Sequence, residues 1–172
     1  ENDILLFDDI RKFGYIKILY NDDVKNYYEK LGPDALNLTQ SNKIKIMEKA
    51  NKSSVEIKTF LLNQKNISGL GNIYVNEILF LSNIDPFIST FKLTSENMNT
   101  IFSNTRIILK KAINNNGTTL SDMTYYLPLG DYGTHQNSLL IYGRNICFSC
   151  SGKIDKLFIN SRATYMCKKC QN

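Results

Sequence analysis

The sequence lacks a long hydrophobic run, an apolar leader and any cysteine before position 147. A helix that crosses a bilayer needs about 18 to 20 consecutive apolar residues, so no transmembrane span is expected. The first residues, Glu-Asn-Asp-Ile, have neither the cations nor the apolar segment of a secretory signal. These absences predict a protein of a reducing cytoplasm or nucleoid, where thiols remain free to bind metal.

The composition is that of a soluble globular chain, with 42% hydrophobic and 22% charged residues among 172. This length allows one sizeable core, or one domain with an appended module. The net charge is only +5, but six cations and two carboxylates after position 130 supply +4 of it. A basic segment favours a polyanionic partner, although an ordinary basic surface would look the same.

All four cysteines lie in the last 26 residues, as two Cys-x2-Cys pairs separated by sixteen residues. The pairs are Cys147 with Cys150 and Cys167 with Cys170. A β-hairpin between them would bring four thiolates together, a donor set that suits one structural Zn2+. Two disulfides, or free thiols, are the alternatives. The single histidine, His135, is not needed as a ligand or expected as a catalyst.

The order of predicted elements changes along the chain. An apolar run at 4–7 and the alternating segment 13–20 read as two strands of a sheet that this sequence does not contain. Helices are then predicted over 24–31, from Thr39 to about 50, after Ser53 or Ser54, from Asn72 to before 85, and from Thr94 to Gly117. A long irregular loop follows over 118–136.

A Gly-x-Gly turn precedes the helix that begins at Asn72. Gly69 and Gly71 would let the backbone turn sharply and approach a ligand. The first amides of the helix are unpaired, and with Asn72 and Lys58 they could bind a phosphate. A plain helical hairpin uses the same kind of turn, so this signal is weak by itself.

Three stretches resemble the bacterial formamidopyrimidine-DNA glycosylases, in the order of that family. Residues 67–80, Ile-Ser-Gly-Leu-Gly-Asn-Ile-Tyr-Val-Asn-Glu-Ile-Leu-Phe, resemble its helix-two-turn-helix. Residues 9–14, Asp-Ile-Arg-Lys-Phe-Gly, resemble its Asp-Pro-Arg-Arg-Phe-Gly loop, with isoleucine in place of proline. Residues 136–144 with the cysteines, and Arg-Ala-Thr-Tyr at 162–165, resemble its zinc finger.

The resemblance implies a mainly α fold: a helix-two-turn-helix domain with a C-terminal zinc β-hairpin, preceded by the last strands of a truncated β-sandwich. The implied boundaries are 1–22 for the end of the sandwich, 23–135 for the helical domain with a lesion-capping loop, and 136–172 for the zinc hairpin. One structural Zn2+ is the implied cofactor.

The resemblance also assigns DNA-binding residues. Arg11 and Phe13 match the pair that fills the gap left by an extruded base, roles that suit a guanidinium and a flat apolar ring. Asn72 and Arg162 match residues that bind phosphates beside the lesion. The remaining implied contacts are Lys58, Gly69, Gly71 and Tyr142.

The implied function is base-excision repair of oxidised purines, by an N-glycosylase that is also an AP lyase. The family's nucleophile is an N-terminal proline, whereas this chain begins at Glu1, and Pro33, Pro86 and Pro128 are tertiary amides. We therefore expect no catalytic residue in this chain, and binding of duplex DNA with oxidised purines or abasic sites, by a monomer, without excision.

Three alternatives remain at this point. One is an endonuclease VIII-like relative that acts on oxidised pyrimidines, although the Gly-Asn-Ile-Tyr and Arg-Lys-Phe-Gly stretches favour the purine branch. Another is a non-catalytic nucleic-acid module with a zinc ribbon. A third is a degenerate fragment that folds poorly.

Overall fold

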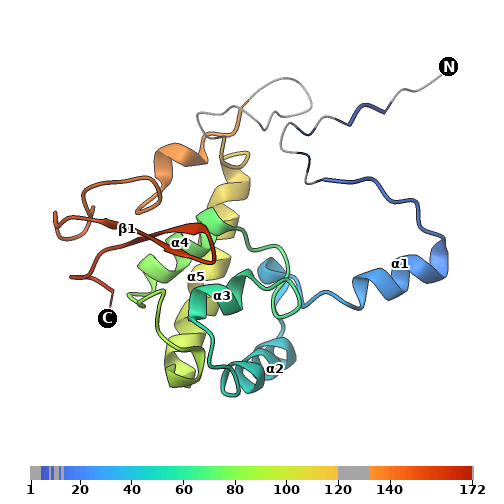
Figure 1. The fold of residues 1–172 in the computed structure, drawn as a ribbon, viewed down its shortest axis with the longest axis horizontal. Coiled ribbons are helices and arrows are strands. Elements are labelled where there is room, and N and C mark those ends of the chain that lie inside the picture. The colour runs from blue at the N-terminus through green and yellow to red at the C-terminus, as the bar shows by residue number, and fades with distance from the viewer. Residues whose placement is uncertain (1–4, 8, 10–11, 13, 120–131, 172) are drawn as a thin grey trace. The chain divides into compact units, whose positions relative to one another are not determined.

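The computed structural model describes residues 5–7, 9, 12, 14–119 and 132–171 (Figure 1). The chain divides into two compact units, residues 1–30 and residues 31–172, which are treated separately below. In the part of the chain that is described, helices dominate and the only sheet has two strands, so the predicted mainly α fold is confirmed. No helix there is long and apolar enough to cross a membrane.

The first unit contains one regular element among its described residues, helix α1 (Asn21–Tyr28). Residues 5–7 and 14–20 form no strand, so the predicted pair of strands is not found in them. A strand requires a hydrogen-bonded neighbour, and a two-stranded hairpin alone is marginal in water. Helix α1 begins three residues before the predicted helix and has no buried residue.

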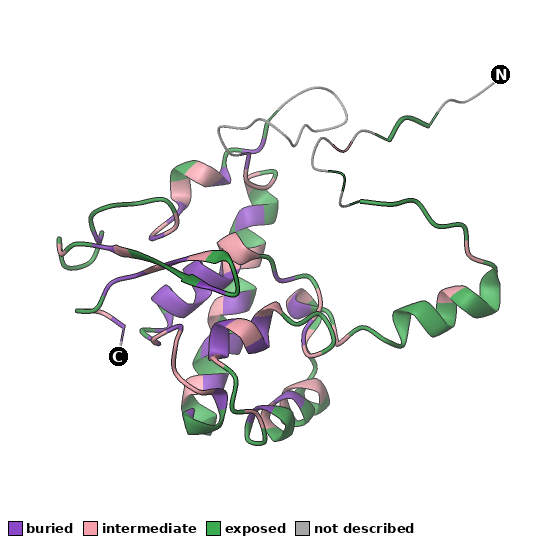
Figure 2. Ribbon diagram, in the orientation of Figure 1, coloured by how far each residue is buried: buried purple, intermediate pink, exposed green. Residues whose placement is uncertain are grey.

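The second unit is built on four α-helices: α2 (Gln40–Ala50), α3 (Ile57–Leu62), α4 (Asn72–Leu81) and α5 (Ser95–Asn114). Three short 3-10 turns accompany them: η1 (Ala35–Asn37) before α2, η2 (Thr90–Lys92) between α4 and α5, and η3 (His135–Ser138) after α5. Helix α4 contacts α3, α5 and the sheet, and Figure 2 shows that much of it is buried.

Two helices begin where the sequence predicts, because their N-caps are local. Thr39 caps α2 by accepting a hydrogen bond from the Asn42 amide at 3.2 Å, and the Asn42 side chain accepts from the Thr39 amide at 3.0 Å. Thr94 and Asn97 form the same reciprocal capping box at α5. Both predicted N-termini are confirmed.

The predicted cap of α3 is wrong. Helix α3 has Glu56 as its N-cap and no side-chain cap, so neither Ser53 nor Ser54 has that role. Its first amides instead donate to backbone carbonyls of a distant segment: the Ile57 amide to Ile88 at 2.9 Å and the Lys58 amide to Pro86 at 3.4 Å. Because these carbonyls come from the loop after α4, the sequence around α3 carries no sign of its cap.

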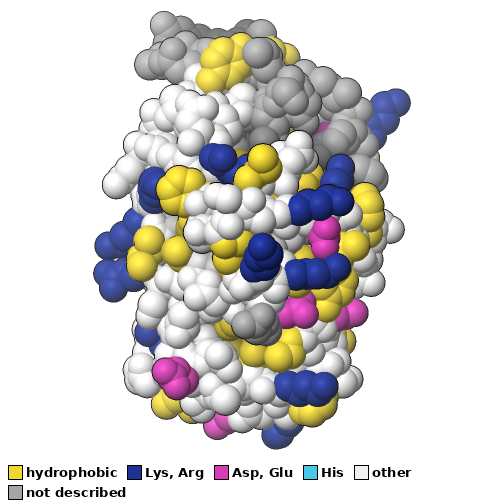
Figure 3. Space-filling model, turned by 90° about the vertical axis from the view of Figure 1, so that its left-hand side faces the viewer, with side chains coloured by type: hydrophobic (Ala, Val, Ile, Leu, Met, Phe, Trp, Pro, Cys, Tyr) yellow, Lys and Arg dark blue, Asp and Glu magenta, His cyan; other side chains and the backbone are white. Residues whose placement is uncertain are grey.

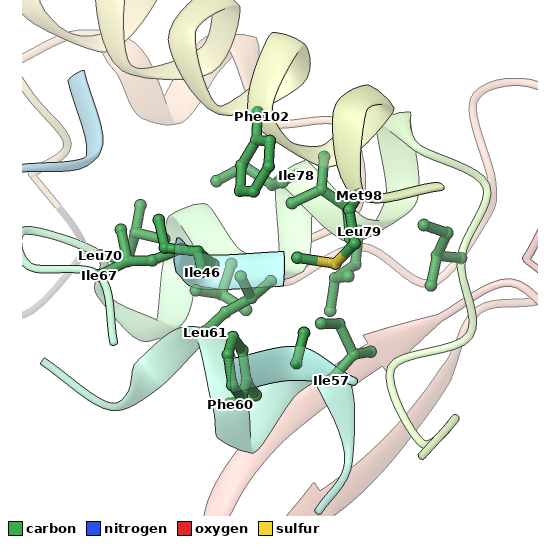
Figure 4. Packing of buried hydrophobic residues seen from close by; sticks show 14 of the residues in the cluster. Ile46, Ile57, Phe60, Leu61, Ile67, Leu70, Ile78, Leu79, Met98 and Phe102 are labelled. Carbon is green, nitrogen blue, oxygen red and sulfur yellow. The ribbon is translucent and has the colours of Figure 1, made fainter. Parts of the chain in front are cut away.

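The main hydrophobic core lies between α2, α3, α4 and α5, and Figure 4 shows its side chains. Helix α4 contributes Val75, Ile78 and Leu79, which are fully buried. Fully burying one such side chain stabilises the fold by roughly 1.5–3 kcal/mol. The predicted apolar face of α3, Ile57, Phe60 and Leu61, also packs here.

The turn between α3 and α4 is held by a hydrogen bond from the segment before α2 and by the Gln64 side chain. The Gly32 amide donates to the Gln64 carbonyl at 2.8 Å, and a Cβ at Gly32 would lie 2.5 Å from the Asn66 carbonyl. Gly69 has φ +88, a conformation that glycine adopts without strain. The Gln64 side chain accepts from the Gly69 amide at 2.8 Å and donates to the Leu70 carbonyl at 2.9 Å.

The C-terminal sheet is the predicted hairpin, with strands β1 (Asp155–Ile159) and β2 (Arg162–Met166). They pair in antiparallel register, with Phe158 opposite Ala163. Asn160 and Ser161 connect them with φ values of 49 and 62, the positive pair typical of a type I′ turn. Arg162 therefore lies directly beside the hairpin tip.

Candidate nucleic-acid interface and metal centre

The four cysteine sulfurs lie within 4.8 Å of one another at the open end of the hairpin. The Cys147 and Cys170 sulfurs are 3.8 Å apart and those of Cys150 and Cys167 are 3.5 Å apart. Regular tetrahedral ZnS4 geometry, with Zn–S near 2.3 Å, places sulfurs about 3.8 Å apart. All four cysteines are free, which excludes the alternative of two disulfides. The site therefore fits one closed, structural zinc ion.

The thiols of this site differ in their surroundings. Cys150 is exposed, and the backbone hydrogen bond from Gly152 lowers the pKa of its thiol to about 7. Burial raises the pKa of the Cys167 thiol. Metal binding requires thiolates, so zinc would displace protons at this site.

Gln171 connects the metal site to the helical core. Its side-chain oxygen accepts from the Cys167 amide at 2.9 Å, and its side-chain nitrogen donates to the Ile84 carbonyl at 2.9 Å. Sequence reasoning missed this residue, because its position beside the last cysteine does not reveal a partner 87 positions away.

Helix α4 holds the zinc module with buried polar side chains. The Asn76 side-chain oxygen accepts from the Tyr165 amide at 2.8 Å. The buried Glu77 carboxylate accepts three backbone amides, from Leu140 at 2.5 Å, Ile141 at 3.0 Å and Tyr142 at 2.8 Å. Sequence reasoning missed both residues. Two polar side chains in an otherwise apolar helix were the available signal.

The Ala163 carbonyl, next to the hairpin tip, is a shared acceptor. It accepts hydrogen bonds from Lys58 Nζ at 2.7 Å, from Asn72 Nδ2 at 3.1 Å and from Asn76 Nδ2 at 3.4 Å. The Asn72 side-chain oxygen is buried and has no hydrogen-bond partner. Residues from α3 and from the first two turns of α4 thus converge on one peptide of β2.

Lys58 and Arg162 have opposite environments. Lys58 is fully buried and also donates to Thr164 Oγ1 at 2.8 Å, whereas Arg162 is exposed. Burial, with a smaller contribution from the Arg162 charge, lowers the pKa of Lys58 to about 8. The exposed guanidinium is the cation that a ligand can reach.

The N-terminus of α4 is open beside the strand that carries Arg162. Gly71 is the N-cap, and no side chain caps the helix. Its φ of −106 is available to any residue, and a Cβ there would meet nothing within 4 Å. Gly71 is therefore not required for the turn; the space in front of it is what glycine preserves. Unpaired amides at such an end attract anions.

An aromatic pair lies next to this region. The rings of Tyr142 and Tyr165 are 4.9 Å apart, and Lys156 Nζ lies 5.9 Å from the centre of the Tyr165 ring. Residues 132–171 contain six cations and a single carboxylate, Asp155. Asp155 forms an ion pair with Lys168 at 2.9 Å. Figure 3 shows Lys and Arg side chains spread among neutral and hydrophobic ones on one face of the molecule.

The helical segment, the hairpin and their shared acceptor can be compared with known proteins. Residues 31–124 match the family profile described as the formamidopyrimidine-DNA glycosylase H2TH domain. The chain belongs to the formamidopyrimidine-DNA glycosylase family. The family predicted from the three motifs is confirmed.

Relatives of this glycosylase family resemble the chain over almost its whole length. The formamidopyrimidine-DNA glycosylase of Mycoplasma pneumoniae is 39% identical over 175 residues, which are 99% of this chain and 62% of the relative. The crystal structure of the MutM (Fpg) protein from Thermus thermophilus superposes with a TM-score of 0.86 at 30% identity, over 95% of this chain and 62% of that one.

A second solved structure contains nucleic acid. The complex between the Lactococcus lactis Fpg and DNA with an abasic site superposes with a TM-score of 0.83 at 34% identity. It covers 95% of this chain and 60% of that protein. The chain thus spans about 62% of the length of its glycosylase relatives.

The glycosylase motifs fall in two groups in the structure. Asn72 lies at the N-terminus of α4, and its side chain bonds the residue that follows Arg162 at the hairpin tip. Gly69 lies in the turn before α4. Arg11 and Phe13, the predicted void-filling pair, lie outside the described residues. So do residues 120–131 of the predicted lesion-capping loop.

The two ends of that loop are described and meet. Thr118 and Thr134 form an antiparallel bridge, and the Thr134 amide donates to the Asn115 carbonyl at 2.9 Å. His135 is buried next to them, with Nδ1 3.2 Å from the Asn115 side-chain nitrogen. Burial lowers the pKa of His135, which keeps its imidazole neutral near pH 7.

Proposed function

We propose that this chain is the DNA-binding part of a base-excision glycosylase and that it binds damaged duplex DNA through phosphates beside the lesion. One observation carries the proposal: the Asn72 side-chain amide donates to the carbonyl of Ala163 at 3.1 Å, and Ala163 directly follows Arg162, which is 90 positions from Asn72 in the sequence. The complex of the related Lactococcus lactis Fpg with abasic DNA supports it.

The physical basis of the phosphate site is a convergence of donors. The unpaired amides of α4 carry partial positive charge. Asn72 Nδ2 has a second N–H beyond the one given to Ala163, and Arg162 adds a charged, bidentate donor. A phosphate oxygen in front of Gly71 would accept from all three without a Cβ in its way.

The zinc ion would be held by the four cysteines and would contribute rigidity, not chemistry. It closes the open end of the hairpin, so that Arg162 is presented on a fixed turn. A side chain on a rigid turn loses less conformational entropy on binding. The Glu77 carboxylate accepts a hydrogen bond from the Tyr142 amide and so fixes its backbone. We assign Tyr142 to the DNA-binding surface that contains Asn72 and Arg162.

For the whole protein we infer excision of oxidised purines followed by cleavage of the abasic strand. The family chemistry uses a secondary amine that attacks the sugar C1′ and forms a Schiff base. We assign Arg11 and Phe13 to the gap left by the extruded base. The residues of this chain contribute binding and positioning, and we expect no excision from them alone.

A competition experiment tests the binding. The zinc-loaded chain should prefer a duplex with a tetrahydrofuran abasic-site analogue to an intact duplex and to RNA at the same salt concentration. Asn72→Ala and Arg162→Gln should each weaken binding by about tenfold, as expected for loss of a charged hydrogen bond. Equal affinity for all three nucleic acids would favour the alternative of a general nucleic-acid module.

A borohydride trap with an 8-oxoguanine duplex tests the inferred absence of excision. Reduction by borohydride makes a Schiff base permanent, so a covalent adduct reports an amine nucleophile. We expect no adduct from residues 1–172. An adduct would show that an amine of this chain can act as the nucleophile.

A further inference from the structure

Lys58 is the one fully buried cation among the described residues, and it lies in the contact between α3 and the zinc hairpin. Its ammonium donates to the Ala163 carbonyl at 2.7 Å and to Thr164 Oγ1 at 2.8 Å. Within the described parts of the chain the only ion pair is Lys168 with Asp155, so no carboxylate compensates the Lys58 charge. The guanidinium of Arg162 repels it.

Such an arrangement does not serve stability alone. A buried ammonium without a counter-charge is destabilising, and an apolar side chain of similar volume fills the same space without that penalty. The neutral acceptors around Lys58 compensate only part of the lost hydration. The charge at this position therefore points to a role other than packing.

The contacts of α3 show what this role is. Lys58 binds the backbone immediately after Arg162, and its neighbour Thr59 accepts a hydrogen bond from the Asn160 side chain at 3.1 Å, just before Arg162. Helix α3 thus holds the hairpin turn on both sides of Arg162. The Ala163 carbonyl is shared with Asn72, which places both phosphate donors on one fixed peptide.

We propose that Lys58 is a positioning residue, which fixes the hairpin tip so that Arg162 and Asn72 bind the same phosphate, and that its ammonium does not itself contact DNA. This inference rests on the proposed function of the Asn72–Arg162 surface. It gives Lys58 a different role from the phosphate contact that its sequence position suggests. A phosphate could reach the ammonium only by displacing β2 from α3, because Lys58 is fully buried.

A double-mutant cycle with Lys58→Met and Arg162→Gln tests this role in the zinc-loaded chain. Affinity for the tetrahydrofuran duplex is measured over a range of salt concentrations. Lys58→Met alone should weaken binding by about tenfold, because it loosens Arg162. In the Arg162→Gln background it should change affinity by less than about twofold, since the contact it supports is already gone.

The salt dependence separates positioning from direct contact. A lysine that binds a phosphate lowers the slope of log affinity against log salt by about 0.9 when it is removed. We expect no such change when Lys58→Met is added to Arg162→Gln. Additive losses of affinity with a further fall in slope would overturn the inference. Undiminished affinity of Arg162→Gln itself would refute the proposed function, and this inference with it.

Two further variants keep the test decisive. Lys45→Met removes an exposed lysine of α2 and should leave affinity within about twofold. If Lys58→Met loses its zinc or fails to fold, Thr164→Val replaces it, because it removes one acceptor of Lys58 and keeps the side-chain shape. Thr164→Val should show the same non-additivity with Arg162→Gln, and additivity would overturn the inference.

Discussion

The helical core and the zinc hairpin are stabilised in different ways. The helical core has seventeen buried hydrophobic residues from four α-helices and the segments between them. The cluster next to the zinc hairpin has five such residues. Two of them are cysteines, and one of the others, Phe80, comes from α4. Apolar burial is enough for the first region. The second is held by hydrogen bonds from α4 and has four cysteines that could hold a metal ion.

This difference has a functional consequence. The helical core can place Asn72 by packing alone, whereas Arg162 lies on two short strands that could not hold it unaided. A metal ion held by the four cysteines would close one end of the hairpin. Lys58 and Asn76 bond β2 to the helices, and Glu77 bonds the segment before the first cysteine. The proposed phosphate site thus joins a region with a large apolar core to one with a small core and polar bonds to α4.

Removal of zinc should have the largest effect and should separate the two regions. With a strong chelator, or in Cys167→Ser, we expect DNA affinity to fall by about 100-fold or more, because zinc binding is folding energy for such a module. The helices should persist. Zinc content, far-ultraviolet circular dichroism and binding to an abasic duplex measure this, and full loss of helix signal would contradict the comparison.

Within the helical core, a matched pair of leucines in α4 measures the contribution of packing. Leu79 is 0% exposed and Leu81 is 37% exposed. Leu79→Ala should lower the free energy of unfolding by about 3–4 kcal/mol, through lost burial and a cavity. Leu81→Ala should lower it by less than about 1 kcal/mol. Urea unfolding of both variants with zinc bound is the measurement.

Glu77 connects the two regions, and its substitution should cause the next largest loss of stability. In Glu77→Gln an amide N–H would face the backbone donors of residues 140–142, so we expect a loss of about 2–3 kcal/mol. Glu48→Gln, on the exposed face of α2, is the control and should change stability by less than about 0.5 kcal/mol. A neutral Glu77→Gln would show that the carboxylate does not dock this segment.

The pH dependence of stability should report the buried ammonium. The pKa of Lys58 is lowered from 10.5 to about 8, so between these values the unfolded chain binds more protons and stability rises with pH. Lys58 can add at most about 1.4 kcal/mol per pH unit in this window. The difference in free energy of unfolding between wild type and Lys58→Met should rise with pH from 8 to 10 and should not change below pH 7. A difference that stays constant from pH 8 to 10 would be inconsistent with burial of the charge.

The smallest effect concerns the cap of α5. Thr94→Ala removes the acceptor of the Asn97 amide and should lower stability by about 1 kcal/mol. Thr94→Ser keeps the hydroxyl and should be close to wild type. Thermal unfolding distinguishes them, and DNA affinity should be unchanged in both because the cap lies outside the phosphate site.

Local features of this protein were predictable because their partners lie within a few residues. The N-caps Thr39 and Thr94 and the sharp turn at Gly69 are of this kind. The four-cysteine site was predictable for another reason, because the paired Cys-x2-Cys spacing is itself the signal although the sulfurs come from positions up to 23 apart. Failures came where the partner is distant. The cap of α3 comes from residues 86–88, and residues 14–20 form no strand because a strand needs a neighbour.

The family and the four clustered cysteines could be predicted from the residues alone. The residues assigned to phosphate binding stay a prediction. Three further points depend on how the chain folds: Lys58 is buried, Ala163 is shared by three donors, and Glu77 bonds residues 140–142. The physical reason is that a residue type fixes which hydrogen bonds a side chain can make. Packing decides whether the partner in each hydrogen bond is water or another part of the chain.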